Sequence, residues 1–153
     1  MKQRLNLIEK GSGAFKLLRG VAKHLDESSI DKQLFELLSF RVSQINGCAF
    51  CLDMHSKELL AKGESAQRLF VLDAWREAPF FSEKERAALA WAEALTILDD
   101  GLVPDDVYEE AARHFTEEEL VDLTLAVTGI NTANRFNIAF GAPVGAYKVG
   151  QFA

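Results

Sequence analysis

Two cysteines and a histidine stand close together in the segment NGCAFCLDMHSKELLAKG, residues 46–63. Cys48 and Cys51 are the two cysteines of the chain, and His55 follows four residues after the second. A Cys-x-x-Cys pair at the start of a helix can close to a disulfide with little backbone movement, and the free N–H groups there favour a thiolate. An imidazole titrates near neutrality and can act as a base. The spacing therefore indicates reversible dithiol chemistry.

Other roles for cysteines follow different spacing rules. A structural zinc site uses four ligands, whereas His24 and His114 have no companion at ligand spacing. Covalent c-type haem needs a histidine directly after the second cysteine, where this chain has Leu52. We therefore expect neither a metal nor another cofactor. Cysteines that only pack as small apolar residues are an alternative that the spacing leaves open.

Helices are expected to position these side chains, because apolar residues recur at helical spacing along the chain. Phe15, Leu18 and Val21 form one such stripe, and Asn46-Gly47 is a helix-stop pair. No stretch shows sustained alternation of apolar and polar residues. The fold class expected is all-α, a single-domain helical bundle over residues 1–153. The expected helices cover residues 12–25, 31–47, 47–63, 66–78, 82–101, 104–115 and 116–141.

Capping residues mark the starts of several of these helices. Ser82 with Glu85 and Thr116 with Glu119 have the spacing of a capping box, and Ser65 is a candidate cap for the helix over 66–78. These signals define the first residues of the helices more closely than periodicity alone does.

The cysteines fall at the start of one expected helix. If that helix begins at Asn46 or Gly47, Cys48 lies in its first turn and Cys51 one turn later. Residues three or four apart share a helix face, so Cys48, Cys51 and His55 form one stripe. The helix dipole by itself favours Cys48, nearer the N-terminus, as the more acidic thiol.

Composition narrows the class of protein. The chain has 153 residues, of which 48% are hydrophobic and 26% charged, so it can build a core. Lysine and arginine number 17 against 23 aspartates and glutamates, a net charge of −6, which disfavours nucleic-acid binding. No signal peptide and no apolar run of about 18 residues is present, so we expect no membrane span and a cytoplasmic location. A structural disulfide would not persist there.

Glu36 is the exceptional residue of the apolar stretch LFELLSF. A buried carboxylate is costly unless it is paired, and burial tends to raise its pKa. The alternative is that Glu36 faces solvent on the polar side of its helix with Lys32 and Ser43. Without further information this alternative is slightly favoured, although the apolar flanks point the other way.

Together these residues resemble a known signature. The pattern resembles the motif of the AhpD-like alkylhydroperoxidases, in the carboxymuconolactone decarboxylase superfamily. It consists of Glu36, eleven residues, Cys48-Ala-Phe-Cys51, three residues and His55. The late segment NTANRFNIAF is similar to the family's final helix, so the resemblance extends roughly over residues 31–142. It implies an all-helical fold, trimeric or hexameric assembly, and peroxide reduction by the dithiol. It also implies re-reduction by a dithiol, in the best-studied members a dihydrolipoyl group on a partner protein.

The resemblance assigns a role to each of four residues. It implies that Cys51 is the peroxidatic thiolate, oxidised to a sulfenic acid, and that Cys48 is the resolving thiol. His55 would relay protons between the thiols and Glu36, the general base. Helix-dipole reasoning favours Cys48 instead, so the identity of the attacking thiol is open.

The chain also departs from the family pattern. Many characterised peroxidases of the family carry a histidine just before the second cysteine, where this chain has Phe50, and they are longer. Two other functions therefore compete: a non-enzymatic redox sensor or interaction module, and a lactone decarboxylase-like enzyme. The decarboxylase branch does not depend on a Cys-x-x-Cys pair, so the dithiol argues against it.

Two further groups of residues have structural and functional interpretations. Asn131, Asn134 and Arg135 could touch the site or a neighbouring subunit, or could cross-link packed helices. Trp75 and Trp91 are expected in the core or at a subunit interface.

Overall fold

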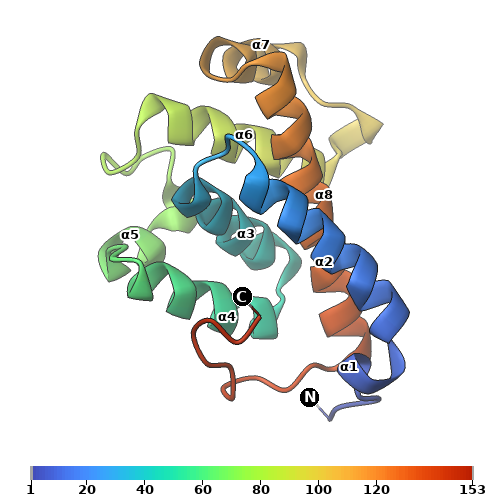
Figure 1. Ribbon diagram of the computed structural model, residues 1–153. Helices are drawn as coiled ribbons and strands as arrows, with labels where there is room; N and C mark the ends of the chain where they lie inside the picture. Colours follow the sequence, from blue (N-terminus) through green and yellow to red (C-terminus); the bar gives the residue numbers. More distant parts are fainter. Residues whose placement is uncertain (1, 153) are drawn as a thin grey trace.

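The structure is a computed structural model that describes residues 2–152, apart from the side chain of Ile8. In this part of the chain it contains α-helices and short 3-10 helices and no strand, which confirms the all-α class (Figure 1). The elements are α1 Leu7–Lys10, α2 Ser12–Glu27, α3 Lys32–Asn46, α4 Ala49–Ala61, α5 Ala66–Phe70, η1 Leu72–Ala74, α6 Glu83–Ile97, η2 Asp99–Gly101, α7 Asp105–His114 and α8 Glu117–Phe140.

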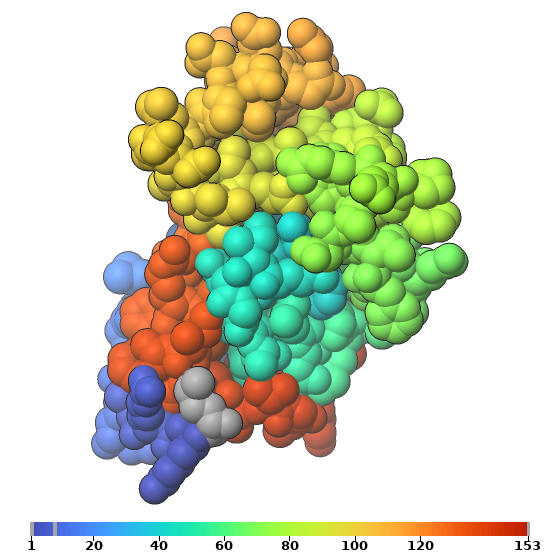
Figure 2. Space-filling model, turned by 180° about the vertical axis from the view of Figure 1, so that it is seen from behind, coloured from blue at the N-terminus to red at the C-terminus, as the bar shows by residue number. Residues whose placement is uncertain are grey.

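Helix α3 lies at the centre and packs against α4, α6 and α8 (Figure 1). It is buried on several sides, since Leu37, Leu38 and Val42 are almost fully enclosed. Its buried residues also include the polar Ser39, Arg41 and Ser43, so α3 is enclosed by its neighbours on more than its apolar face. Helix α2 packs on α8, and α7 packs on α6. The segment of α7 and the N-terminal segment lie at opposite ends of the molecule (Figure 2).

The predicted capping signals at two helix starts are confirmed. Ser82 and Glu85 form a complete capping box at α6, as Thr116 and Glu119 do at α8. At the end of α8, Gly141 has a positive φ of 68°, a conformation that glycine adopts without steric cost.

Helix α4 starts two or three residues later than expected. Gly47 takes a left-handed conformation that ends α3, and Cys48 is extended, so the helix begins at Ala49. Cys48 is therefore the N-cap rather than a first-turn residue, because an N-cap has non-helical backbone angles. Cys51 is in the first turn.

The helix expected over residues 66–78 is broken. It ends at Phe70, and a 3-10 turn over Leu72–Ala74 follows. Leu69, Leu72 and Trp75 are buried at intervals of three residues, the repeat of a 3-10 helix. The predicted side-chain cap by Ser65 is wrong, since that serine makes no cap hydrogen bond.

The segment after α8 has no helix, as expected, but it packs closely across α4 (Figure 1). Lys57 on α4 donates to the carbonyl of Tyr147 at 3.1 Å, and the Tyr147 hydroxyl donates to Glu58. Tyr147 is buried. This C-terminal segment, residues 142–152, covers one side of the helix that carries the cysteines. No helix in the described part of the chain is long and apolar enough to cross a membrane.

Candidate active site

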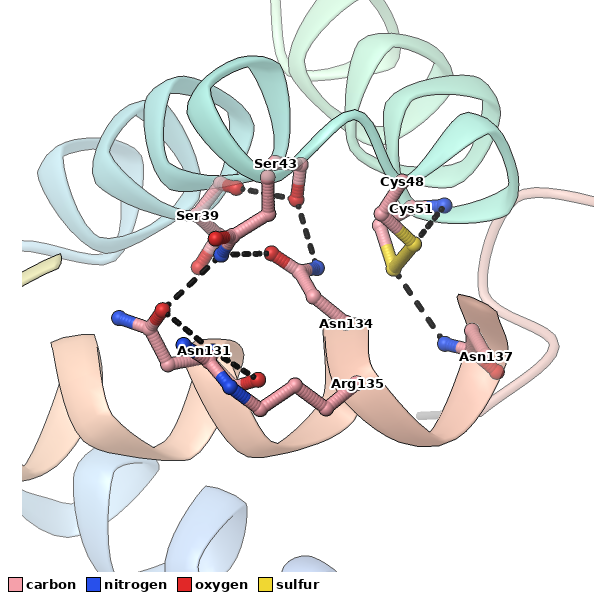
Figure 3. The surroundings of a disulfide bond; sticks show 9 residues. Ser39, Ser43, Cys48, Cys51, Asn131, Asn134, Arg135 and Asn137 are labelled. Carbon is pink, nitrogen blue, oxygen red and sulfur yellow. Dashed lines mark hydrogen bonds between the residues drawn. A yellow bond between two sulfur atoms is a disulfide. The ribbon is translucent and has the colours of Figure 1, made fainter. Parts of the chain in front are cut away.

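Cys48 and Cys51 are joined by a disulfide at the start of α4 (Figure 3). Their Cα atoms are 5.4 Å apart, and the two residues are 1% and 0% exposed. The backbone N–H of Cys51 donates to Cys48 Sγ at 3.4 Å. The local geometry of the N-cap therefore brings the two sulfur atoms together and supplies a donor that would stabilise a thiolate at Cys48.

The second sulfur atom has its own donor. Asn137 Nδ2, near the end of α8, donates to Cys51 Sγ at 3.3 Å (Figure 3). Sequence analysis did not single out this residue, although it lies in the segment NTANRFNIAF. Its spacing from Asn134 places it one turn further along the same helix, which is the signal that could have identified it. An amide donor at this position favours negative charge on Cys51.

Glu36 and His55 come from different helices and meet. Glu36 Oε2 lies 2.7 Å from His55 Nδ1, and Lys62 Nζ donates to Glu36 Oε1 at 3.1 Å. The side chains of Glu36 and His55 are 14% and 7% exposed. The alternative of a solvent-facing Glu36 is therefore wrong, because the packing of α3 against α4 turns this face of α3 inward. Ser43, grouped with it in that alternative, is fully buried.

The Glu36 carboxyl stays ionised despite its burial. Burial acts to raise its pKa, but the hydrogen bond and charge of His55, with a further contribution from Lys62, outweigh it and lower the pKa below its ordinary value. An ionised carboxylate only accepts hydrogen bonds, so His55 Nδ1 carries the proton between the two groups.

The role of the other ring nitrogen depends on the charge of the ring. Nε2 donates in the imidazolium, whereas in a neutral imidazole with its proton on Nδ1 it is an acceptor. His55 Nε2 is buried and has no hydrogen-bond partner among the described residues. His55 lies one helical turn after Cys51, on the same face of α4. Its free nitrogen is available for a proton from a thiol or a substrate.

The polar residues of α8 mostly join helices together. Asn46 Nδ2 donates to the side-chain oxygens of Asn131 and Asn134, both at 2.9 Å, and Asn134 Nδ2 donates to Ser43 Oγ at 3.0 Å (Figure 3). Arg135 donates to Asn131. The network ties the end of α3, immediately before the cysteines, to α8. Asn131 and Asn134 thus fit the structural interpretation, whereas Arg135 is exposed and donates along its own helix.

Both tryptophans are buried, which agrees with the expectation that they lie in the core. Trp75 and Trp91 are 5% and 8% exposed. Trp75 Nε1 donates to Glu93, which also pairs with the buried Arg41. Burial acts to raise the pKa of Glu93, but its hydrogen bonds and the Arg41 charge lower it. These contacts stabilise the buried charge of Glu93 on α6, so its burial needs no catalytic explanation.

Two cavities of about 390 Å³ each flank α4. The first, here the α2 chamber, is lined by residues of α2, α3, α4, α8 and the C-terminal segment, and it contains His55 and Glu36. The second, here the N-terminal chamber, contains Asn137 and Phe50. Met54, Tyr147 and Phe152 line both chambers. His55 thus lines one chamber and Asn137 the other, while Cys48 and Cys51 are buried and line neither.

Known proteins share this sequence and architecture. Residues 13–94 match the carboxymuconolactone decarboxylase family. Over 141 residues the chain is 41% identical to the uncharacterized protein YdfG of Bacillus subtilis, which covers 92% of this chain and 96% of that one. A solved structure from Agrobacterium tumefaciens, of a protein of unknown function connected by name to AhpD, has a TM-score of 0.90 at 37% identity. The match covers 95% of this chain and 100% of that one.

A protein with a named activity is similar over a shorter stretch. The alkyl hydroperoxide reductase AhpD of Streptomyces coelicolor is 44% identical over 64 residues, which are 40% of this chain and 36% of that protein. The similarity thus covers about a third of the AhpD chain.

Proposed function

The chain belongs to the carboxymuconolactone decarboxylase family, and from this premise we propose that it is a thiol-dependent peroxidase of the AhpD-like type. The observation that carries the proposal is the contact between Glu36 and His55, one helical turn from a paired and buried Cys48 and Cys51. A dithiol that only packs would not need a buried carboxylate–imidazole pair beside it. Partial similarity to AhpD supports the same reaction class.

The reaction follows from the positions of these groups. Cys51 gives its proton to His55 Nε2, and the thiolate attacks the terminal oxygen of the peroxide. The O–O bond breaks, Cys51 becomes a sulfenic acid, and the alkoxide takes the proton back from His55 and leaves as an alcohol. Cys48 then attacks the sulfenic sulfur, which forms the disulfide and releases water. Glu36 stabilises the imidazolium in between.

Cys51 is the proposed attacking thiol on two grounds. It is closer along α4 to His55 than Cys48 is, and Asn137 donates to its sulfur at 3.3 Å. Cys48, the N-cap, accepts the N–H of Cys51 and can act as the resolving thiol. This assignment agrees with the roles implied by the AhpD-like signature.

A dithiol donor must close the cycle. Its thiolate attacks the disulfide, restores Cys48 and Cys51, and leaves as a disulfide itself. We propose a dihydrolipoyl group on a partner protein as this donor and the cytosol as the location, since thiols are kept reduced there.

Steady-state turnover tests this function. With an organic hydroperoxide and a donor, each protein molecule should consume many equivalents of peroxide, and mild peroxide alone should remove two hydrogens from the native mass. Assays with lipoyl, thioredoxin-type and glutathione donors identify the reductant. A redox sensor would instead consume one equivalent and stop. If both thiols remain open to alkylation after peroxide, the dithiol chemistry is refuted.

We also propose that the protein is a homotrimer or homohexamer. Large apolar side chains remain exposed on a single chain, among them Leu17, Phe70 and Val121 at 75%, 83% and 69%. Closed symmetric assembly would cover such surface. Light scattering coupled to size exclusion at micromolar concentration is expected to give three or six times 17.0 kDa. A mass of one chain that does not change with concentration would contradict this prediction.

A further inference from the structure

Two buried polar atoms share the α2 chamber and lack partners. Ser39 Oγ and His55 Nε2 have no hydrogen-bond partner among the described residues, and the two residues are 1% and 6% exposed. Both residues line the α2 chamber. A buried polar group without a partner costs about 1–3 kcal/mol in general, so two in one cavity indicate a site that a ligand completes.

Ser39 belongs to this site by its place on α3. It follows Glu36 by three residues, so the two lie on the same helix face. Both line the chamber, as His55 of α4 does. The main-chain carbonyl of Ser39 accepts from Ser43 Oγ at 2.7 Å, whereas its own hydroxyl bonds to nothing described (Figure 3). The hydroxyl is therefore free to bind a molecule in the chamber.

The remaining walls of the chamber are apolar over most of their area, with charged side chains at Asp26, Lys32, Glu58 and Lys62. Helix α2 presents Leu18, Val21 and Leu25, of which Leu25 alone is fully buried against its neighbours. Gly129 on α8 lets α2 approach, since a Cβ there would lie 3.3 Å from Val21. The volume of about 390 Å³ is within the usual range of small-molecule sites, about 300–1,000 Å³. The chamber thus fits an organic molecule with an apolar body.

The two polar atoms define the head group. In the neutral form of His55, with Nδ1 protonated toward Glu36, Nε2 accepts a hydrogen bond, while the Ser39 hydroxyl can donate one. A head group that both donates and accepts through one O–H satisfies the pair.

We infer that the α2 chamber binds an amphipathic hydroxyl or hydroperoxyl compound, with its head between Ser39 Oγ and His55 Nε2 and its body against α2. The identity of the reacting head group rests on the proposed peroxidase function, whereas the binding site does not. In that reaction the hydroperoxide R–O–O–H enters and the alcohol R–O–H leaves, so both carry the same kind of head. Ser39 is then a substrate-binding residue that the AhpD-like signature does not include.

The product alcohol is the appropriate probe, because it binds without reacting. We expect 2-phenyl-2-propanol to bind the oxidised wild-type protein in calorimetry and to shift the ¹⁵N resonance of His55 Nε2. Ser39→Ala should weaken binding about 2- to 10-fold, the usual value of one hydrogen bond, and Ser39→Thr, which keeps the hydroxyl, should restore it. The methyl ether of the same alcohol, which lacks the O–H, should bind less tightly than the alcohol.

Ser43→Ala is the matched control. Ser43 is also a buried serine of α3, but it accepts from Asn134 and does not line the chamber. Its loss should lower thermal stability and leave alcohol affinity unchanged, whereas Ser39→Ala removes an unpartnered hydroxyl and should fold normally. Equal affinity of Ser39→Ala and wild type, equal affinity of ether and alcohol, or no binding at all would overturn the inference. Alcohol binding that depends on Ser39 in a protein without peroxide turnover would instead refute only the peroxidase function.

Discussion

Replacement of Cys51 by serine is expected to lower peroxide turnover by about 1,000-fold or more, because a serine hydroxyl is not a nucleophile comparable to a thiolate toward an O–O bond. Steady-state peroxide consumption with a dithiol donor measures the loss. The side chain is 0% exposed and its sulfur accepts from Asn137, a bond that a hydroxyl can keep. The fold should therefore persist, as circular dichroism can verify.

Cys48→Ser is the matched control for the order of the two steps. If Cys51 attacks the peroxide, this variant should still lose one thiol and trap a sulfenic acid, which a dimedone-type reagent labels. Turnover should cease, because the resolving thiol is missing from position 48, whose Cα lies 5.4 Å from that of Cys51. A Cys51→Ser variant that still forms a sulfenic acid at Cys48, together with an inert Cys48→Ser, would reverse the assignment.

Replacement of Glu36 by glutamine is expected to slow thiol oxidation at neutral pH by about 100- to 10,000-fold, the usual contribution of general acid–base catalysis. Glutamine is nearly isosteric, but it removes the charge that holds the proton on His55 Nδ1 and stabilises the imidazolium. Stopped-flow measurement of the oxidation step, before any donor acts, isolates this effect. A rate within about threefold of wild type would remove Glu36 from the relay.

The pH dependence supplies a second readout of the same change. The pKa of Glu36 is lowered in the folded protein, so its ionised form contributes stability that is present above the unfolded pKa and lost as pH falls through the folded pKa. Wild type should therefore be more stable than Glu36→Gln at neutral pH, and the difference should shrink below about pH 4. Chemical denaturation at several pH values measures it.

Glu64→Gln provides the control for burial alone. Glu64 is also a buried glutamate, but it pairs with Arg68 at 3.0 Å and lies outside the α2 chamber. This variant is expected to lose stability and to keep the wild-type rate of thiol oxidation. An equal loss of rate in both variants would indicate a general structural effect.

The local features of this protein can be predicted from its sequence. Capping boxes at Ser82 and Thr116 predicted the starts of two helices, and Asn46-Gly47 predicted the end of α3. The Cys-x-x-Cys spacing predicted the sulfur pair as well, because three residues at a helix start bring two Sγ atoms within bonding reach. Each of these signals acts within one or two turns of chain, so neighbouring residues are enough to specify it.

The site is completed by contacts between helices. The residue type of Glu36 slightly favoured a solvent-facing side chain, and the packing of α3 against α4 instead placed it 2.7 Å from His55. Asn137, which is 86 residues away in the chain, donates to Cys51. Ser39 becomes a candidate binding residue because it lines the α2 chamber. The break after Phe70 likewise follows from which side chains the core accepts. Such contacts depend on how the helices are placed relative to one another. Buried surface and shape complementarity determine this placement, and no local sequence signal encodes it.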